Sequence, residues 1–141
     1  MTAVMHWHGF GPWQGGHEVF EMKNDALRRP REDWDTTTVP PLETGNYLLR
    51  RSQASRERTW TRVEDALDWL AGLHDQHPHD PTLNYPDKAT RLKHTRDGLL
   101  GGADALWHYT TSISANRVVV YAVICCPHRH HTRTPCPLPP P

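Results

Sequence analysis

The residues with the greatest capacity for chemistry gather near the C-terminus of the chain. All three cysteines and three of the eleven histidines lie within twelve consecutive residues, 125–136. Thiolate and imidazole are the ligands that zinc selects, and a structural zinc site takes four of them in a tetrahedron. The candidate ligands in this segment are Cys125, Cys126, His128, His131 and Cys136.

The spacing of these residues resembles only part of a known zinc motif. Cys126, His131 and Cys136 are separated by four residues each, as are the last three ligands of a zinc knuckle. The position of the first ligand holds Val123, which cannot bind a metal. A fourth ligand would have to be Cys125, His128 or a histidine from elsewhere. The alternative interpretation is a solvated tail in which one cysteine is a small buried apolar residue.

A second candidate metal site lies near the N-terminus. Residues 3–8 have the composition of a short strand, and in a strand His6 and His8 project from the same face. A hairpin with residues 17–23 would add His17. Three histidines with one open position are the arrangement of a catalytic zinc, for which Glu18 or Glu21 could act as general base. Zinc is therefore the cofactor that both candidate sites suggest.

Two further groups of residues indicate other classes of function. A histidine-based ribonuclease needs one histidine, a glutamate or second histidine, and an arginine. The candidates for these roles are His94, His108 and Arg117. Cations interleaved with an aromatic residue are typical of nucleic-acid contact, and here they are Arg50, Arg51, Arg56, Arg58, Trp60 and Arg62. Neighbouring acids such as Glu57 and Glu64 offer these arginines partners within the chain.

Composition limits the possible functions further. The formal net charge is zero, which argues against a non-specific nucleic-acid-binding protein. The chain contains no glycine-rich phosphate loop, no nucleophile elbow and no H-E-x-x-H metal motif. Three cysteines are an odd number, which favours a reducing cytoplasm over a disulfide framework. The sequence also contains no apolar stretch long enough to span a membrane.

Periodicity predicts the elements that would position these residues. Strands are expected at residues 3–8, 17–23, 46–52, 106–114 and 117–124. Helices are expected from a capping box at Thr61 and Glu64 up to Pro78, and over residues 87–97. The last strand is apolar on both faces, so it should be central in the sheet. Ala115 and Asn116 should form the preceding hairpin turn.

The order of elements predicts an α+β fold, with two helices packed on a mostly antiparallel sheet of about five strands. We expect one domain at residues 1–126 and a His/Cys/Pro-rich extension at residues 127–141. Six tryptophans would serve as anchors of the core and of contacts with partners.

The combined features favour a small non-enzymatic binding protein. Its partner is expected to be a protein; a nucleic acid is the alternative, and no membrane contact is expected. Thirteen arginines against three lysines are typical of a GC-rich genome and suggest a bacterial or phage accessory protein in the cytoplasm. The competing classes are a metal- or histidine-dependent enzyme and a nucleic-acid-binding regulatory module.

Overall fold

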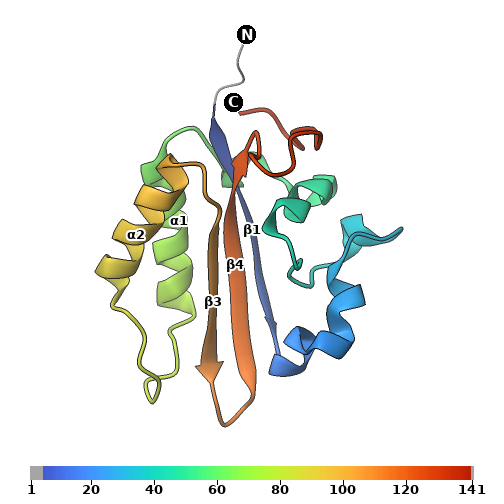
Figure 1. The fold of residues 1–141 in the computed structure, drawn as a ribbon. Helices are drawn as coiled ribbons and strands as arrows, with labels where there is room; N and C mark the ends of the chain where they lie inside the picture. Colours follow the sequence, from blue (N-terminus) through green and yellow to red (C-terminus); the bar gives the residue numbers. More distant parts are fainter. Residues whose placement is uncertain (1–4, 141) are drawn as a thin grey trace.

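The protein forms one antiparallel sheet that carries helices on one face, as Figure 1 shows for the computed structural model, which describes residues 5–140. The four strands stand in the order β2-β1-β4-β3, with antiparallel pairing throughout. The predicted α+β class is confirmed, with four strands rather than about five. The regular elements are β1 (His6–Gly15), β2 (Thr59–Trp60), α1 (Val63–Gln76), α2 (Lys88–Leu100), β3 (Ala105–Ser112) and β4 (Arg117–Cys126).

β4 is a central strand, as its apolar sequence predicts. It pairs with β1 on one side and with β3 on the other, so that Val123 lies opposite both Gly9 and Ala105. Each residue of β4 after Arg117 is buried, because both faces of the strand are covered. The turn before β4 contains Asn116 at a φ of 50°, the left-handed conformation expected for this hairpin.

The two faces of the sheet are covered by different kinds of structure. In Figure 1, α1 and α2 lie on one side of the strands and a series of short 3-10 helices lies on the other. The helical side holds the larger core, which includes Leu70, Leu99 and Tyr121. The core of the irregular side consists of Phe10, Tyr47, Leu48, Ala122 and Ile124. The irregular side therefore depends on a small number of apolar contacts.

The strand predicted at residues 17–23 is wrong. This segment forms η1 (His17–Phe20) and the beginning of η2 (Met22–Arg28), both 3-10 helices. The predicted hairpin with the N-terminal strand is therefore absent, and β1 pairs with β4 and β2. The Phe20 ring accounts for the tight winding, because it packs against the Trp13 ring at 5.6 Å and lies under the Arg28 guanidinium at 4.7 Å.

The strand predicted at residues 46–52 is also wrong. The chain there forms η4 (Thr44–Leu49) and η5 (Arg51–Gln53). Asn46, Tyr47 and Leu48 are all buried although they are consecutive. A strand points successive side chains to opposite faces, whereas a tight helical turn can direct neighbours into one core. The Tyr47 ring stacks on the Phe10 ring at 5.0 Å and thereby fixes the turn against β1.

The N-terminal strand and the two helices form, with shifted ends. β1 begins at His6 and continues to Gly15, and residues 3 and 4 of the predicted strand lie outside the described residues. α1 begins at Val63 without a side-chain cap, so the predicted capping box does not form. α2 begins after Asp87, whose carboxylate accepts a hydrogen bond from the Thr90 N–H at 2.7 Å.

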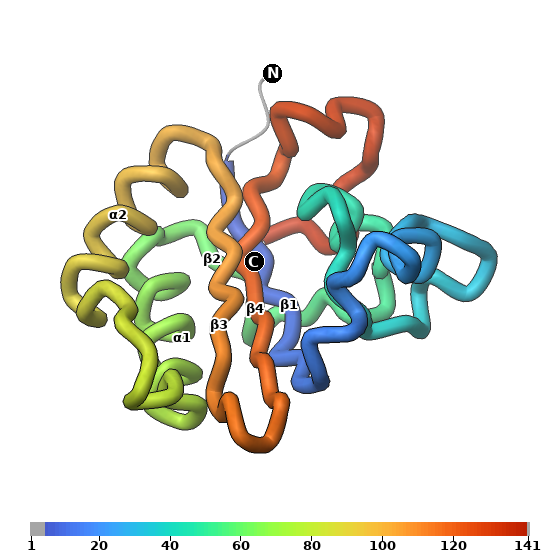
Figure 2. Tube along the Cα trace, turned by 60° about the horizontal axis from the view of Figure 1, so that its bottom comes forward, coloured from blue at the N-terminus to red at the C-terminus, as the bar shows by residue number. Residues whose placement is uncertain are grey.

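The chain after β4 turns back over the irregular face, as Figure 2 shows by the red segment beside the blue start of β1. His128 and Pro137 are buried in this segment. The segment is thus packed on the sheet, whereas the proposed domain boundary after residue 126 stays a prediction. Neither α-helix in residues 5–140 combines the length and apolar composition that a membrane span requires.

The small core of the irregular face gives a first testable prediction. Ile124 is fully buried there, so we expect Ile124→Ala to lower the free energy of unfolding by about 2–5 kcal/mol. Ile113 is 53 % exposed, and Ile113→Ala should change this free energy by less than about 0.5 kcal/mol. Urea denaturation of both variants measures the difference. Equal effects of the two substitutions would contradict the described packing.

Candidate metal centre

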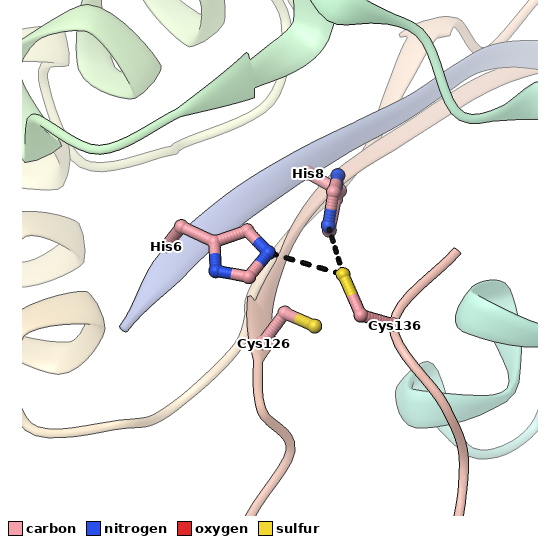
Figure 3. Close-up of side chains that lie close together, drawn as sticks. All are labelled: His6, His8, Cys126 and Cys136. Carbon is pink, nitrogen blue, oxygen red and sulfur yellow. Dashed lines mark hydrogen bonds between the residues drawn. The ribbon is translucent and has the colours of Figure 1, made fainter. Parts of the chain in front are cut away.

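Pairing of β1 with β4 brings the two groups of predicted metal ligands together. His6 and His8 lie on the same face of β1, on the side opposite the α-helices. The antiparallel register places His6 directly opposite Cys126, the last residue of β4. Figure 3 shows these three side chains directed toward one another from the two adjacent strands. All three are buried.

The fourth ligand comes from the returning C-terminal segment. The Cys136 Sγ atom lies 3.2 Å from His6 Nε2 and 3.6 Å from His8 Nε2 (Figure 3). The Cys136 main chain is held from the other side, because Arg51 Nη1 lies 3.4 Å from its carbonyl oxygen. The four ligand atoms of this Cys2His2 cluster, taken as His6, His8, Cys126 and Cys136, lie within 4.8 Å of one another.

These separations are close to those that a tetrahedral ion requires. Zinc bonds to nitrogen and sulfur of about 2.0–2.3 Å place neighbouring ligand atoms roughly 3.3–3.8 Å apart. The 3.6 Å contact between His8 Nε2 and Cys136 Sγ falls within this range, and the 3.2 Å contact from His6 Nε2 is just below it. The widest pair needs an approach of about 1 Å. The cluster could therefore hold a metal ion with small side-chain movements.

A hydrogen bond outside the cluster prepares His8 to bind a metal. His8 Nδ1 lies 2.9 Å from Thr59 Oγ1, and that hydroxyl donates to the Ser55 carbonyl oxygen at 2.7 Å. The hydroxyl must therefore accept from His8, which places the ring proton on Nδ1 and leaves the Nε2 lone pair facing the cluster. Such support of a ligating imidazole is typical of metal sites. Burial and the nearby His6 lower the pKa of His8 to about 4, so its ring is neutral at pH 7.

The two adjacent cysteines have opposite environments. Cys126 faces the cluster, and its burial together with the Cys136 thiol raises its pKa. Metal binding at this site would therefore release a proton from Cys126. Cys125 faces the helical core and lies with its Sγ 4.0 Å from the Leu99 carbonyl oxygen. Burial raises its pKa to about 12, and it takes no part in the cluster.

The other predicted ligands lie elsewhere. His17 is on η1, where its Nε2 lies 3.4 Å from Thr110 Oγ1. His131 packs over Gly45, and its Nε2 lies 3.9 Å from the carboxylate of Glu43. The structure thus combines two members of the C-terminal group with two members of the N-terminal alternative. All four residues were candidate ligands in the sequence, and a histidine from elsewhere was one option for the fourth ligand of the C-terminal group. His6 and His8 were placed in a separate site because the N-terminal strand was expected to pair with residues 17–23, whereas it pairs with β4.

His128 belongs to a second polar group at the start of the returning segment. Its Nε2 lies 2.6 Å from Asp104 Oδ2, and its Nδ1 accepts from the His130 N–H at 3.1 Å. Asp104 also accepts from the Thr44 hydroxyl at 2.5 Å and from the Cys125 N–H at 2.9 Å. Both ring nitrogens of His128 are therefore occupied by hydrogen bonds. The hydrogen bonds around Asp104 hold the start of the returning segment against the fold, and His128 is not available as a base.

The three catalytic candidates do not form one site. His94 lies on α2 beside a shallow pocket that Trp107 also lines. His108 projects from the opposite face of β3 and packs on the Phe20 ring at 4.3 Å. Arg117 begins β4 and lies 3.5 Å from the Gln14 side chain. Within residues 5–140, no described contact joins any two of the three.

The arginine-rich segment is divided between the interior and the surface. Arg50 is fully buried and Trp60 packs against the Trp69 ring at 5.4 Å, so neither presents an open surface to a nucleic acid. Arg58 is half-buried and donates to the Gly11 carbonyl oxygen at 2.9 Å. The exposed members of the group are Arg51, Arg56 and Arg62. Nucleic-acid contact by these three stays a prediction.

Removal of the Asp104 carboxylate should release the returning segment. We expect Asp104→Ala to lower the free energy of unfolding by about 2–4 kcal/mol, because it leaves several buried donors without an acceptor. Trypsin should then cleave after Arg129 and Arg133 faster than in the wild type. Asp97→Ala, at an exposed position of α2, is the matched control and should change neither measurement. An unchanged rate of proteolysis in the Asp104 variant would show that Asp104 does not hold the returning segment in place.

Comparison with known proteins gives no assignment for the chain. No family model matches it, and no curated protein or solved structure is detectably similar to it. The interpretation of the site therefore rests on the chemistry and geometry of its own residues, above all on the cluster of two imidazoles and two thiols.

Proposed function

We propose that the protein is a non-enzymatic binding protein in which a structural zinc ion fixes the C-terminal segment as a contact surface. The observation that carries the proposal is the convergence of two histidines and two cysteines from three separate parts of the chain. Sulfur and imidazole together favour zinc over magnesium or calcium, which prefer oxygen.

The donor set supports a structural role for the ion. Four protein ligands complete a tetrahedron, whereas a catalytic zinc takes three and leaves a position for water or substrate. Three of the four residues are buried, and only Cys136 is partly exposed. An ion held in this way would join β1, β4 and the returning segment. It would stabilise the face of the sheet that has the smaller apolar core.

The proposed contact surface is the segment between two anchored residues of the C-terminal chain. His128 is held by Asp104 and Cys136 by the cluster, so residues 129–135 form a loop anchored at both ends. Arg129, His130 and Arg133 are exposed on it. A pocket of about 440 Å³ lies between this loop and residues 42–45. A rigid loop loses little entropy on binding, and its cations suit an acidic protein surface.

Metal analysis tests the zinc ion directly. We expect the purified protein to contain one zinc per chain, and Cys136→Ser to weaken its binding by more than about 100-fold, since loss of supporting groups alone costs 10–100-fold. Cys125→Ala is the matched control, because this thiol faces away from the cluster, and it should retain the metal. Chelation should lower the melting temperature of wild type and control. A metal-free wild type with an unchanged melting temperature after zinc addition would refute the proposal.

The contact surface is tested by charge reversal on the metal-loaded protein. The double substitution Arg129→Glu and Arg133→Glu should abolish retention of the partner in affinity capture from the native cell. The control double substitution Arg56→Glu and Arg62→Glu changes the same charge at exposed sites outside the loop and should retain it. Nuclease treatment of the lysate should leave the capture unchanged. Equal retention by both variants would exclude this loop as the surface.

A further inference from the structure

A second pocket on the irregular face has features that the proposed function does not use. Its volume is about 460 Å³, and it lies between residues 11–13 of β1, the chain around Asp35 and residues 50–58. None of the four residues of the Cys2His2 cluster lines it. Two arginines, Arg50 and Arg58, are part of its wall. The pocket therefore brings together Arg50 and Arg58, the two arginines of the arginine-rich segment that are not fully exposed on the surface.

Arg50 is buried inside the wall of this pocket. Its guanidinium lies 4.0 Å from the centre of the Trp34 ring, and its Nη2 donates to the Val39 carbonyl oxygen at 2.6 Å. Its Nε donates to the Trp34 carbonyl oxygen, so neutral groups supply its described contacts. Its Nη1 has no hydrogen-bond partner among the described residues. Burial lowers the pKa of Arg50 to about 10, so the side chain keeps its positive charge at neutral pH.

Arg58 is fixed at the pocket by neutral acceptors as well. Its Nη1 donates to the Gly11 carbonyl oxygen at 2.9 Å, and its Nη2 donates to the Gln53 carbonyl oxygen at 3.1 Å. These contacts orient the guanidinium without neutralising it. Its side chain is thus held in place before any ligand binds, which reduces the entropy that binding would cost.

The positive charge of the pocket has no matching carboxylate. Within residues 5–140, no carboxylate oxygen lies within 4.0 Å of either guanidinium. Asp35 also lines the pocket, but its carboxylate accepts from the Ser52 N–H at 2.9 Å. That hydrogen bond, together with others to Ser52 and the charge of Arg51, lowers the pKa of Asp35. Neither guanidinium is therefore paired with a carboxylate, and two arginines against one aspartate leave the lining with an excess positive charge that an anion would balance.

We propose that this pocket binds a small organic phosphate, whose phosphate group contacts Arg58 and is attracted by the buried charge of Arg50 behind the pocket wall. A guanidinium group favours phosphate because its planar donors match the phosphate oxygens. The pocket is several times larger than a phosphate ion, and the aromatic residues Trp13 and Tyr47 line it. These rings suit a flat apolar group attached to the phosphate.

Isothermal titration calorimetry of the metal-loaded protein with phenyl phosphate tests the proposal. We expect saturable binding that Arg58→Met weakens by about 10–100-fold, the loss typical of one charge-assisted contact. Arg56→Met is the matched control, because Arg56 lies on the same 3-10 helix but does not line the pocket. It should bind phenyl phosphate as the wild type does. Inorganic phosphate should bind more weakly than phenyl phosphate, since it cannot contact the rings.

A second variant keeps the test decisive if Arg58→Met does not fold. Thr38 is exposed at the rim of the pocket, so Thr38→Glu should fold normally and place a negative charge beside the ligand. It should weaken binding of phenyl phosphate at least about tenfold by repulsion. Absence of saturable heat in the wild type up to about 10 mM ligand would overturn the proposal. Binding that a folded pocket variant leaves unchanged would overturn it too.

Discussion

The structure depends on the antiparallel pairing of β1 with β4. Their register sets His6 opposite Cys126 and His8 opposite Ile124, on the face that lacks α-helices. A slip by one residue would turn both histidines toward the helical core and bring Trp7 to the other face. The chemistry of the site and the burial of the largest side chains are therefore fixed by the same pairing. β4 fixes this register, because its buried apolar residues pack into a core on both faces of the sheet and a shift would expose or misplace them.

The asymmetry of the two faces explains why a metal would be useful at this place. The helical face gains its stability from a continuous apolar core beneath α1 and α2. The irregular face is built from short 3-10 helices, which have poor hydrogen-bond geometry and bury few apolar groups. Ordering such a chain costs conformational entropy, and the apolar cluster that offsets this cost is smaller here than on the helical face. Metal binding is coupled to folding, so an ion at the Cys2His2 cluster would stabilise the face that has the smaller apolar core.

Local patterns predicted the helical side of the fold better than the irregular side. The apolar run of β4, the turn at Asn116 and the periodicity of α1 are short-range signals, and each predicted element exists. Residues 17–23 and 46–52 have strand-like composition, but contacts made by Phe20 and Tyr47 with distant residues wind them into tight turns. Residues of the cluster were identified from their types. They meet in one cluster because β1 pairs with β4, more than a hundred residues away in the sequence. Hydrophobic periodicity does not predict which strands pair.

The arginine-rich segment lies between the two proposed binding sites. Thr59, within this segment, fixes the tautomer of His8, and Arg51 Nη1 lies 3.4 Å from the carbonyl oxygen of Cys136. Arg50 and Arg58, on the same stretch of chain, form the cationic wall of the second pocket. A run of charged residues is usually expected on the surface. Here successive residues lie in the interior, beside the Cys2His2 cluster and in the wall of the second pocket. Because this stretch has little regular structure, a ligand bound at either proposed site would stabilise the folded state that the other site also requires.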